Sequence, residues 1–276
     1  MRMALMENPE STNAVHRAGL IWTNILGGIL FALVAGCATE ARPAQLDAGE
    51  KALAAQQYDV ALRNADSVLS MDAPASQAEA RYLRGLVIED RPKANPMSAQ
   101  HDLDAARGEY SLALSQTPTM PVEARIHAQL GNVAYFSEDY STALREWTLA
   151  DAQLDMPMWK AWILYRMGIC QQRLGRFTDA DQTFSRVQQL YPNTEPATRA
   201  HSREGAHGFY VQLGAFAQAA DAQRAAAAIL ALGSVPMKTM QGNLTIIQTK
   251  GMPTFSQASA LRARLVGSYP DAKIMP

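Results

Sequence analysis

Four glycines recur along this chain, each within a helical run of sequence. Gly49, Gly85, Gly131 and Gly168 are separated by 36, 46 and 37 residues. Each is followed by a bulky residue and, three positions later, by an alanine: Tyr58/Ala61, Leu103/Ala106, Tyr140/Ala143 and Phe177/Ala180. A period of this length predicts helix pairs that stack on their neighbours, because one pair alone cannot bury its apolar face. We therefore expect an α-solenoid over residues 46–200.

A large aromatic residue follows the alanine by four positions in three of the units, as Tyr110, Trp147 and Phe184, whereas the first unit has Ala65 there. This pattern resembles the tetratricopeptide repeat (TPR), whose paired helices need small residues where they cross and bulky ones to fill the gap. The match is strongest over residues 164–192. The second unit carries about ten additional residues around positions 91–96, which we expect to form a loop between its helices.

The resemblance to TPR proteins implies a concave groove that holds a peptide or a partner helix. Trp159 and Trp162 come just after Met156-Pro157-Met158, where the chain enters a new repeat, and they are the candidate partner-binding residues. The alternative is that both fill the core together with Tyr135, Trp147 and Tyr165. No dense charged stripe marks the groove, so the sequence does not identify the partner.

From residue 208 to residue 276 the pattern changes to strand–helix–strand–strand–helix–strand. The strands are predicted at 209–216, 235–240, 244–249 and 272–275, and the helices at 219–232 and 255–266. Gly242-Asn243 is a hairpin signal between the middle strands. Two βαβ halves of this size predict a split-βαβ domain with both helices on one face of a four-stranded sheet. The fold class is thus an α-solenoid followed by a small α+β domain, with residues 201–207 as the linker.

Alternation along the first strand predicts which side chains face the helices. Phe209, Val211 and Leu213 should face them, and Tyr210, Gln212 and Gly214 should point to the open face.

The octapeptide Phe-Tyr-Val-Gln-Leu-Gly-Ala-Phe at 209–216, followed by an Ala-rich helix, resembles the start of the SPOR domain (sporulation-related repeat). That family is a peptidoglycan-binding module of bacterial envelope proteins, and it recognises glycan strands stripped of their stem peptides. The resemblance implies that Gln212, in the Val-Gln-x-Gly-x-Phe motif, lines the glycan-binding face. The other candidate glycan-binding residues are Tyr210, Gly214, Ala215, Leu244 and Ile246.

The second half of this domain departs from the family pattern. Residues 247–253 stand where a Val-x-x-Gly-Pro-Phe-like segment is expected, and Leu244 and Ile246 occupy places where characterised relatives carry Trp and Arg. The alternative interpretation is that Tyr210 and Gln212 are ordinary solvent-facing strand residues.

Cys37 closes an apolar run near the start of the chain. Residues 19–34 are apolar apart from Thr23 and Asn24, and Leu-Val-Ala-Gly-Cys at 33–37 resembles a bacterial lipobox. The resemblance implies a signal peptide over residues 1–36, lipidation of Cys37, and a tether over residues 37–45. Because Ala38 rather than Asp follows the cysteine, we expect an anchor in the outer membrane, facing the periplasm. The alternative is an uncleaved anchor or an ordinary signal peptide.

Composition and motifs argue against several function classes. A net charge of −1 leaves no basic footprint for nucleic acid, and the strand at 244–249 lacks the aromatic residues of an RNA-binding sheet. No phosphate-binding glycine loop or His-Glu-x-x-His motif occurs, so we predict no catalysis and no cofactor. His101, Asp102 and Asp104 fall near a helix start, where such residues serve as caps rather than metal ligands. Cys170 is predicted to be a small buried residue.

These observations predict a non-enzymatic envelope lipoprotein that acts in cell division or wall remodelling. Its C-terminal domain would bind peptidoglycan glycan strands, and its solenoid groove would bind an unidentified envelope protein. The alternative is an outer-membrane assembly or scaffold lipoprotein, in which the solenoid does the work and the C-terminal domain only docks protein.

Overall fold

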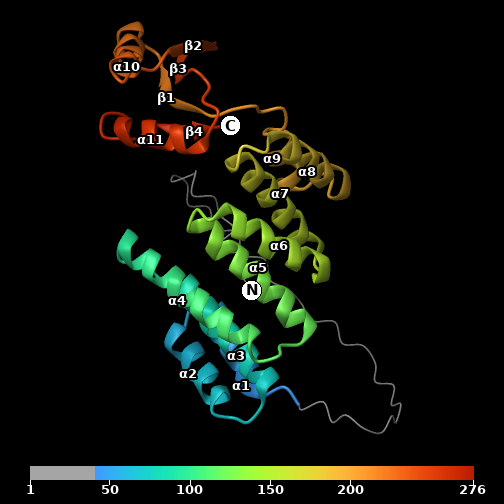
Figure 1. The fold of residues 1–276 in the computed structure, drawn as a ribbon. Helices are drawn as coiled ribbons and strands as arrows, with labels where there is room; N and C mark the ends of the chain where they lie inside the picture. The colour runs from blue at the N-terminus through green and yellow to red at the C-terminus, as the bar shows by residue number, and fades with distance from the viewer. Residues whose placement is uncertain (1–40) are drawn as a thin grey trace.

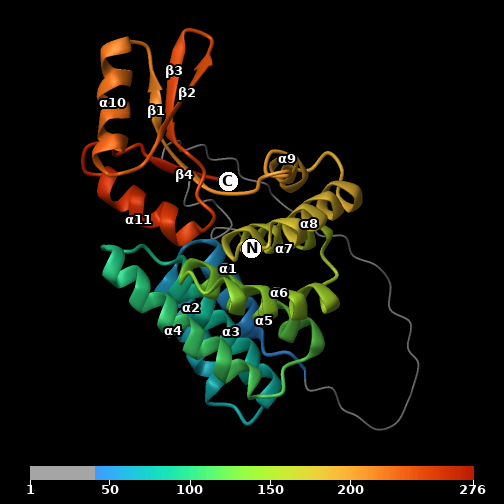
Figure 2. The same ribbon diagram turned by 45° about the horizontal axis from the view of Figure 1, so that its top comes forward.

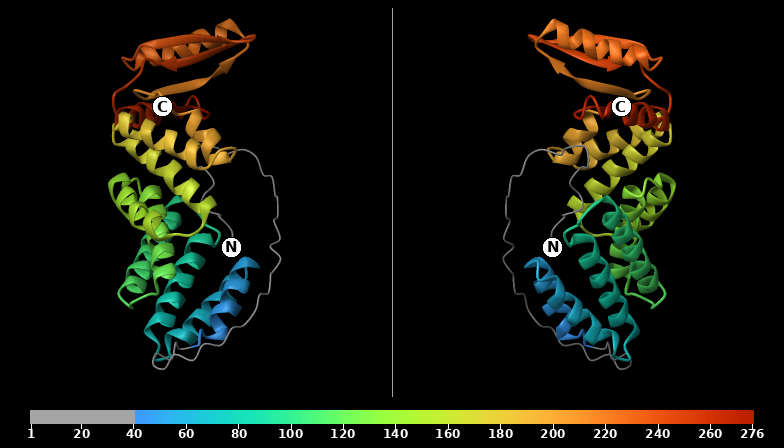
Figure 3. Two further views of the ribbon diagram at one scale, coloured as in Figure 1. Left: turned by 90° about the vertical axis from the view of Figure 1, so that its right-hand side faces the viewer. Right: turned by 90° about the vertical axis from the view of Figure 1, so that its left-hand side faces the viewer.

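The structure is a computed structural model that describes residues 41–276. The predicted signal peptide, the lipobox and Cys37 lie outside these residues. Helices stack along one direction, and the C-terminal sheet lies at the opposite end of the molecule from the first helix pair (Figures 1 and 3). No helix within residues 41–276 is long and apolar enough to cross a membrane.

The helical part, which we call the solenoid, is built of helix pairs followed by one short helix, and this confirms the predicted repeat architecture. Helices α1 and α2, α3 and α4, α5 and α6, and α7 and α8 pack as pairs, and α9 packs on the last pair (Figure 1). Their bounds are Ala44–Ala54 (α1), Tyr58–Leu69 (α2), Pro74–Asp90 (α3), Pro96–Leu114 (α4), Met120–Phe136 (α5), Tyr140–Gln153 (α6), Pro157–Arg173 (α7), Phe177–Leu190 (α8) and Glu195–His201 (α9).

The recurring glycines are the places where paired helices cross. A methyl group at Gly85, Gly131 or Gly168 would lie only 2.3, 2.3 and 2.4 Å from the rings of the aromatic residues Tyr110, Trp147 and Phe184. All three aromatic side chains are fully buried. In the first unit, which has Ala65 in place of the aromatic residue, the nearest atom to such a methyl group belongs to Leu83 of α3. Close packing within the last three pairs, and of α1 against α3, therefore depends on the absence of a side chain at the glycine.

The additional residues of the second unit form a short loop and also lengthen a helix. The loop is confined to residues 91–95, and the remainder forms the first turns of α4. Asn95 caps α4 by accepting a hydrogen bond from the Ser98 backbone N–H at 2.9 Å. The expectation that the acidic residues near this helix start act as caps is therefore wrong.

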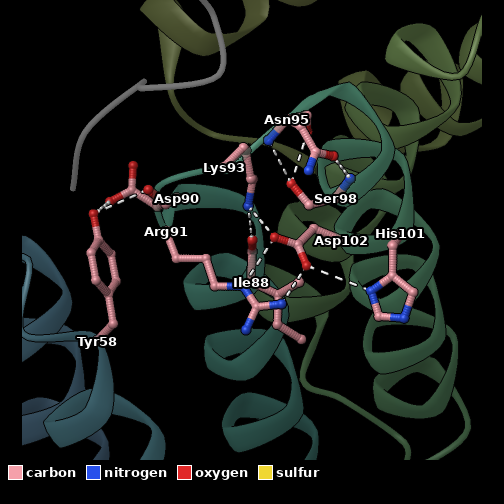
Figure 4. A network of polar contacts seen from close by, with 9 residues as sticks. All are labelled: Tyr58, Ile88, Asp90, Arg91, Lys93, Asn95, Ser98, His101 and Asp102. Atoms are coloured by element: carbon pink, nitrogen blue, oxygen red, sulfur yellow. Dashed lines mark hydrogen bonds and ion pairs between the residues drawn. The ribbon is translucent and has the colours of Figure 1, made fainter.

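Asp102 instead holds the loop in place (Figure 4). Its carboxylate is 7% exposed and accepts hydrogen bonds from Arg91 Nε at 3.0 Å and from Lys93 Nζ at 2.7 Å. The guanidinium of Arg91 binds both carboxylate oxygens. These two cations hold the pKa of Asp102 well below its usual range. His101 is exposed, with Nδ1 3.8 Å from the same carboxylate.

Two segments predicted as flexible connections are tied to neighbouring helices. In the predicted linker, the Gln172 amide donates to the Arg203 carbonyl at 3.0 Å, and the Gly205 backbone N–H donates to Asp181 at 2.9 Å. In the predicted tether, Arg42 donates to Glu79 of α3 at 2.6 Å, and α1 already begins at Ala44.

The C-terminal part, which we call the sheet domain (residues 208–276), has the predicted split-βαβ fold. Its strands are Tyr210–Phe216 (β1), Pro236–Gln241 (β2), Leu244–Thr249 (β3) and Lys273–Met275 (β4), and its helices are Ala219–Ala231 (α10) and Phe255–Leu265 (α11). The strand order is β2-β3-β1-β4, and all neighbouring strands are antiparallel. Both helices lie on one side of the sheet (Figure 2). This arrangement leaves the other face of the sheet uncovered by either of them.

Candidate functional site

The side of the sheet that faces the helices is a closed apolar core. Phe209, Val211 and Leu213 are 2%, 0% and 2% exposed, and they pack with Ile229 of α10 and Leu265 of α11. The alternation predicted for these three residues is therefore confirmed. Thr249 belongs to this side as well, since its Oγ1 accepts a hydrogen bond from the Val211 backbone N–H at 2.9 Å.

A β-bulge changes the expected alternation after Gln212. Gln212 lies opposite Gln248, but the next pair joins Gly214 to the buried residue Ile247, so Leu213 is an extra residue in β1. Gly214 consequently lies on the helix side, and a methyl group there would be 3.3 Å from the Phe216 ring. The expectation that Gly214 points to the open face is wrong, because alternation restarts after a bulge.

The bulge brings Ala215 onto the open face. Ala215 is opposite Ile246 on β3, and Tyr210 and Gln212 are partly exposed two strand positions apart on β1. Leu244 is 40% exposed, two positions before Ile246 on the same side. Five of the six candidate glycan-binding residues thus lie on one face of the sheet.

The strand register places six further residues on this face. They are Met237, Thr239 and Gln241 on β2, Gln248 on β3, and Lys273 and Met275 on β4. Lys273 is the one charged residue in the set. Amide and hydroxyl groups beside apolar side chains suit a ligand that offers hydroxyl and amide groups. Sequence reasoning predicted β2 and β4 as strands but did not identify their open-face residues, which follow from the register alone.

The open face continues into a pocket where β1 enters the sheet. The pocket has a volume of about 550 Å³ and is lined by residues 206–208, residues 251–253, Tyr210 and Pro276. The two segments are held together by a pair of backbone hydrogen bonds between Phe209 and Met252, of 2.8 and 2.6 Å. Tyr210 belongs both to the pocket and to the open face.

Trp159 and Trp162 pack inside the solenoid. Each is 8% exposed, and the Trp162 ring meets the Tyr165 ring edge-on at 5.8 Å between centroids. The guanidinium carbon of Arg199 in α9 lies 5.2 Å from the centre of the Trp162 ring. This burial favours the core alternative for both tryptophans and leaves little of either ring for a partner.

The sheet domain packs against the end of the solenoid through aromatic rings. Phe255 at the start of α11 meets the Tyr140 ring edge-on at 6.0 Å, and the Arg173 guanidinium carbon lies 3.4 Å from the centre of the Phe255 ring. Phe177 of α8 lies 5.5 Å from Phe209 of the sheet domain. The sequence analysis missed this contact, because Phe177 and Phe209 each fit the apolar pattern of their own domain.

The titratable groups buried in the solenoid have structural roles. Cys170 is fully buried, as predicted, and burial raises the pKa of its thiol. Glu89 is 5% exposed and accepts a hydrogen bond from the Tyr110 hydroxyl, and burial raises its pKa to about 8. Within residues 41–276, no group of three or more His, Cys, Asp or Glu residues could hold a metal ion.

Comparison with protein families identifies the sheet domain. Residues 205–276 match the model of the SPOR domain family. No curated protein sequence matches the chain. The chain is thus a helical repeat region followed by a domain that matches the SPOR family, and SPOR domains are typically non-catalytic binding domains.

Three solved structures resemble this chain over more than half of its length. A structure titled "Crystal structure of MamA protein" is 16% identical and covers 58% of this chain and 80% of its own, with a TM-score of 0.43. TTC0263, a thermophilic TPR protein from Thermus thermophilus, is 17% identical over 58% of this chain and 79% of its own, with a TM-score of 0.46. Pseudomonas aeruginosa pilF is 15% identical over 83% of this chain and 92% of its own, also with a TM-score of 0.46.

Proposed function

We propose that this protein binds peptidoglycan glycan strands, stripped of their stem peptides, on the open face of its SPOR domain. The observation that carries the proposal is the open face itself. Tyr210, Gln212 and Ala215 lie there beside Leu244 and Ile246, on the side of the sheet opposite its two helices. A SPOR domain implies a location in the cell envelope, where such strands occur.

The chemistry of the open face fits a denuded glycan better than an intact one. The sugar chain offers hydroxyl and acetamido groups, which Gln212 and Gln248 can bind as donors and acceptors. Stem peptides add bulk and further carboxylates beside the sugars, beyond the one lactyl carboxylate that each N-acetylmuramic acid keeps when its peptide is removed. Lys273 is the one cation of the set that could bind such groups. The open face therefore favours the less charged, bare chain.

The solenoid supplies the second binding function in this proposal, which is to hold an envelope protein partner. Stacked helix pairs form an extended surface, and such surfaces usually bind peptides or helices. With Cys37 as a lipid anchor in the outer membrane, the protein would bring its partner to sites of cell division or wall remodelling. The described residues do not include Cys37, and labelling of the protein by a radioactive fatty acid, lost in Cys37→Ser, tests the anchor.

Co-sedimentation with purified sacculi tests the glycan proposal. The full chain is mixed with sacculi that have been treated with an amidase and with sacculi that retain their stem peptides. We expect the protein to pellet with the treated sacculi, and Gln212→Ala to abolish most of this pelleting. The matched control is Gln218→Ala, because Gln218 is exposed at the start of α10 and its side chain makes no capping hydrogen bond.

Failure to pellet with either preparation would refute glycan binding. It would favour the alternative in which the SPOR domain only docks protein and the chain acts as a scaffold. In that case, open-face variants should disturb capture of a protein partner from envelope extracts.

A further inference from the structure

The open face does not end at Tyr210, because the pocket at the entrance to β1 continues it. The Tyr210 side chain lies on the open face and also lines the pocket. Gln212 is two strand positions further on, or about 7 Å along β1. A chain ligand that lies on Gln212 and runs toward the start of β1 therefore reaches this pocket next.

The walls of the pocket suit an uncharged amino sugar. No Asp, Glu, Lys or Arg of the described chain lines the pocket, and its polar side chains are the His207 imidazole and the Tyr210 hydroxyl. Within residues 41–276 neither group has a hydrogen-bond partner, so both are available to a ligand. The Tyr210 ring and Pro253 add apolar surface for the methyl group and the C–H face of an N-acetylated sugar.

The solenoid holds one wall of the pocket in place. Residues 206–208 follow the segment whose backbone is bound by Gln172 and Asp181, and Phe177 of α8 lies against Phe209. The facing wall, residues 251–253, is joined to β1 by the two backbone hydrogen bonds between Phe209 and Met252. A site with fixed walls binds at a lower entropic cost than one that must first be ordered.

We propose that this pocket is an additional subsite of the glycan-binding face, which takes an N-acetylated sugar residue beyond those that lie on the sheet. The proposal rests on the proposed function. It assigns a binding role to His207 and Gly251. It also makes the segment that joins the solenoid to β1 part of the wall-binding site.

Gly251 allows the pocket to be filled without disturbing the fold. A methyl group at Gly251 would meet no atom of the described chain within 4 Å, and the residue does not have a left-handed backbone conformation. Gly251→Leu should therefore place its side chain in the open space of the pocket. Gly108→Leu is the matched control, because Gly108 has the same open surroundings on the exposed side of α4.

The experiment compares a peptide-free disaccharide and a peptide-free hexasaccharide from amidase-treated wall, by calorimetric titration of the full chain. The wild-type protein should bind the hexasaccharide more tightly. Gly251→Leu and His207→Ala should each weaken hexasaccharide binding about two- to tenfold, the range expected for one lost hydrogen bond, and leave disaccharide binding unchanged. Gln212→Ala should weaken both ligands, and Gly108→Leu neither.

Equal hexasaccharide affinities for wild type, Gly251→Leu and His207→Ala would overturn the subsite and leave glycan binding on the sheet intact. No binding of either sugar to the wild-type protein would instead overturn the proposed function. His207→Ala removes a polar group from an exposed position, so it tests the pocket independently of the bulkier Gly251→Leu.

Discussion

The Arg173 guanidinium carbon lies 3.4 Å from the centre of the Phe255 ring, and this contact joins the last helix pair to the first turn of α11. A cation stacked on an aromatic face at this distance stabilises by about 0.5 to 2 kcal/mol, depending on how far it is removed from water. The Tyr140 and Phe209 rings meet the same phenyl ring at 6.0 and 5.6 Å. Phe255 is thus the side chain on which the two domains converge.

Phe255→Ala should loosen the contact between the domains. We expect it to remove about 1 to 3 kcal/mol from the free energy that couples them, because it deletes the aromatic contact with Tyr140 and the stacked cation of Arg173. Urea unfolding followed by tryptophan fluorescence and by circular dichroism should then separate into two transitions. Leu230→Ala is the control, since Leu230 is 60% exposed on α10, and one unchanged transition in both variants would contradict the prediction.

Alanine substitutions at two helical glycines should have opposite effects. Gly131→Ala places a methyl group 2.3 Å from the Trp147 ring and should destabilise the protein by about 1 to 3 kcal/mol through overpacking. Gly108→Ala meets nothing and should stabilise α4 by up to about 1 kcal/mol, because alanine has the higher helix propensity. Thermal unfolding measures the change in melting temperature, which should be negative for Gly131→Ala and positive for Gly108→Ala. A rise for both variants would show that the distance between the crossing helices does not limit the α5–α6 pair.

Asp102→Asn should destabilise the protein at neutral pH by about 1 to 3 kcal/mol, because it removes a buried charge that binds Arg91 and Lys93. The pKa of Asp102 is lower in the folded protein than in the unfolded chain. Its contribution to stability is therefore fully present above about pH 4 and declines as the pH falls toward the folded-state pKa. Denaturation curves measure the difference in the free energy of unfolding between wild type and Asp102→Asn, and this difference should be smaller at pH 3 than at pH 7. Asp104→Asn is the control and should differ little from wild type at either pH.

The contribution of Glu89 to stability should change with pH in the opposite direction to that of Asp102. Burial raises its pKa to about 8, so between about pH 4.3 and pH 8 the folded protein holds a proton that the unfolded chain has lost. Stability should fall with rising pH across this window, by up to about 1.4 kcal/mol for each pH unit. The side chain in Glu89→Gln stays neutral, so the free energy of unfolding of this variant should fall less steeply with pH. Unfolding measured at pH 5.5, 7 and 8.5 would test this. Parallel slopes for the two proteins would contradict the assignment.

The solenoid could be predicted from sequence because its packing repeats. The sequence separation between the glycine and its aromatic residue is the same in the last two pairs, so Gly131 with Trp147 and Gly168 with Phe184 can be read without knowing the fold. The inward residues of β1 were predictable for a similar reason, since strand alternation has a fixed period. Local periodicity was enough for both features.

The remaining features depend on pairs of residues with no local pattern. The bulge at Leu213 follows from the register of β1 against β3, a strand about thirty residues away along the chain. It moves Gly214 to the helix side of the sheet and Ala215 to the open face. The Arg173–Phe255 contact joins two domains, and neither residue departs from what its own helix would contain. A tryptophan in a solenoid is equally suited to a core and to a groove, so only the packing around Trp162 decides between them.

The hydrogen bonds that fix the segment between α9 and β1 determine how the protein responds to pulling. Gln172 and Asp181 hold the backbone at Arg203 and Gly205, so only the few residues between Gly205 and β1 can extend before α7 and α8 are loaded. If the sheet domain binds a wall strand while the N-terminal end of the chain is held, tension passes into α7 and α8. The last helix pair would then be strained first, which makes the solenoid a mechanical element between the wall and whatever holds its N-terminal end.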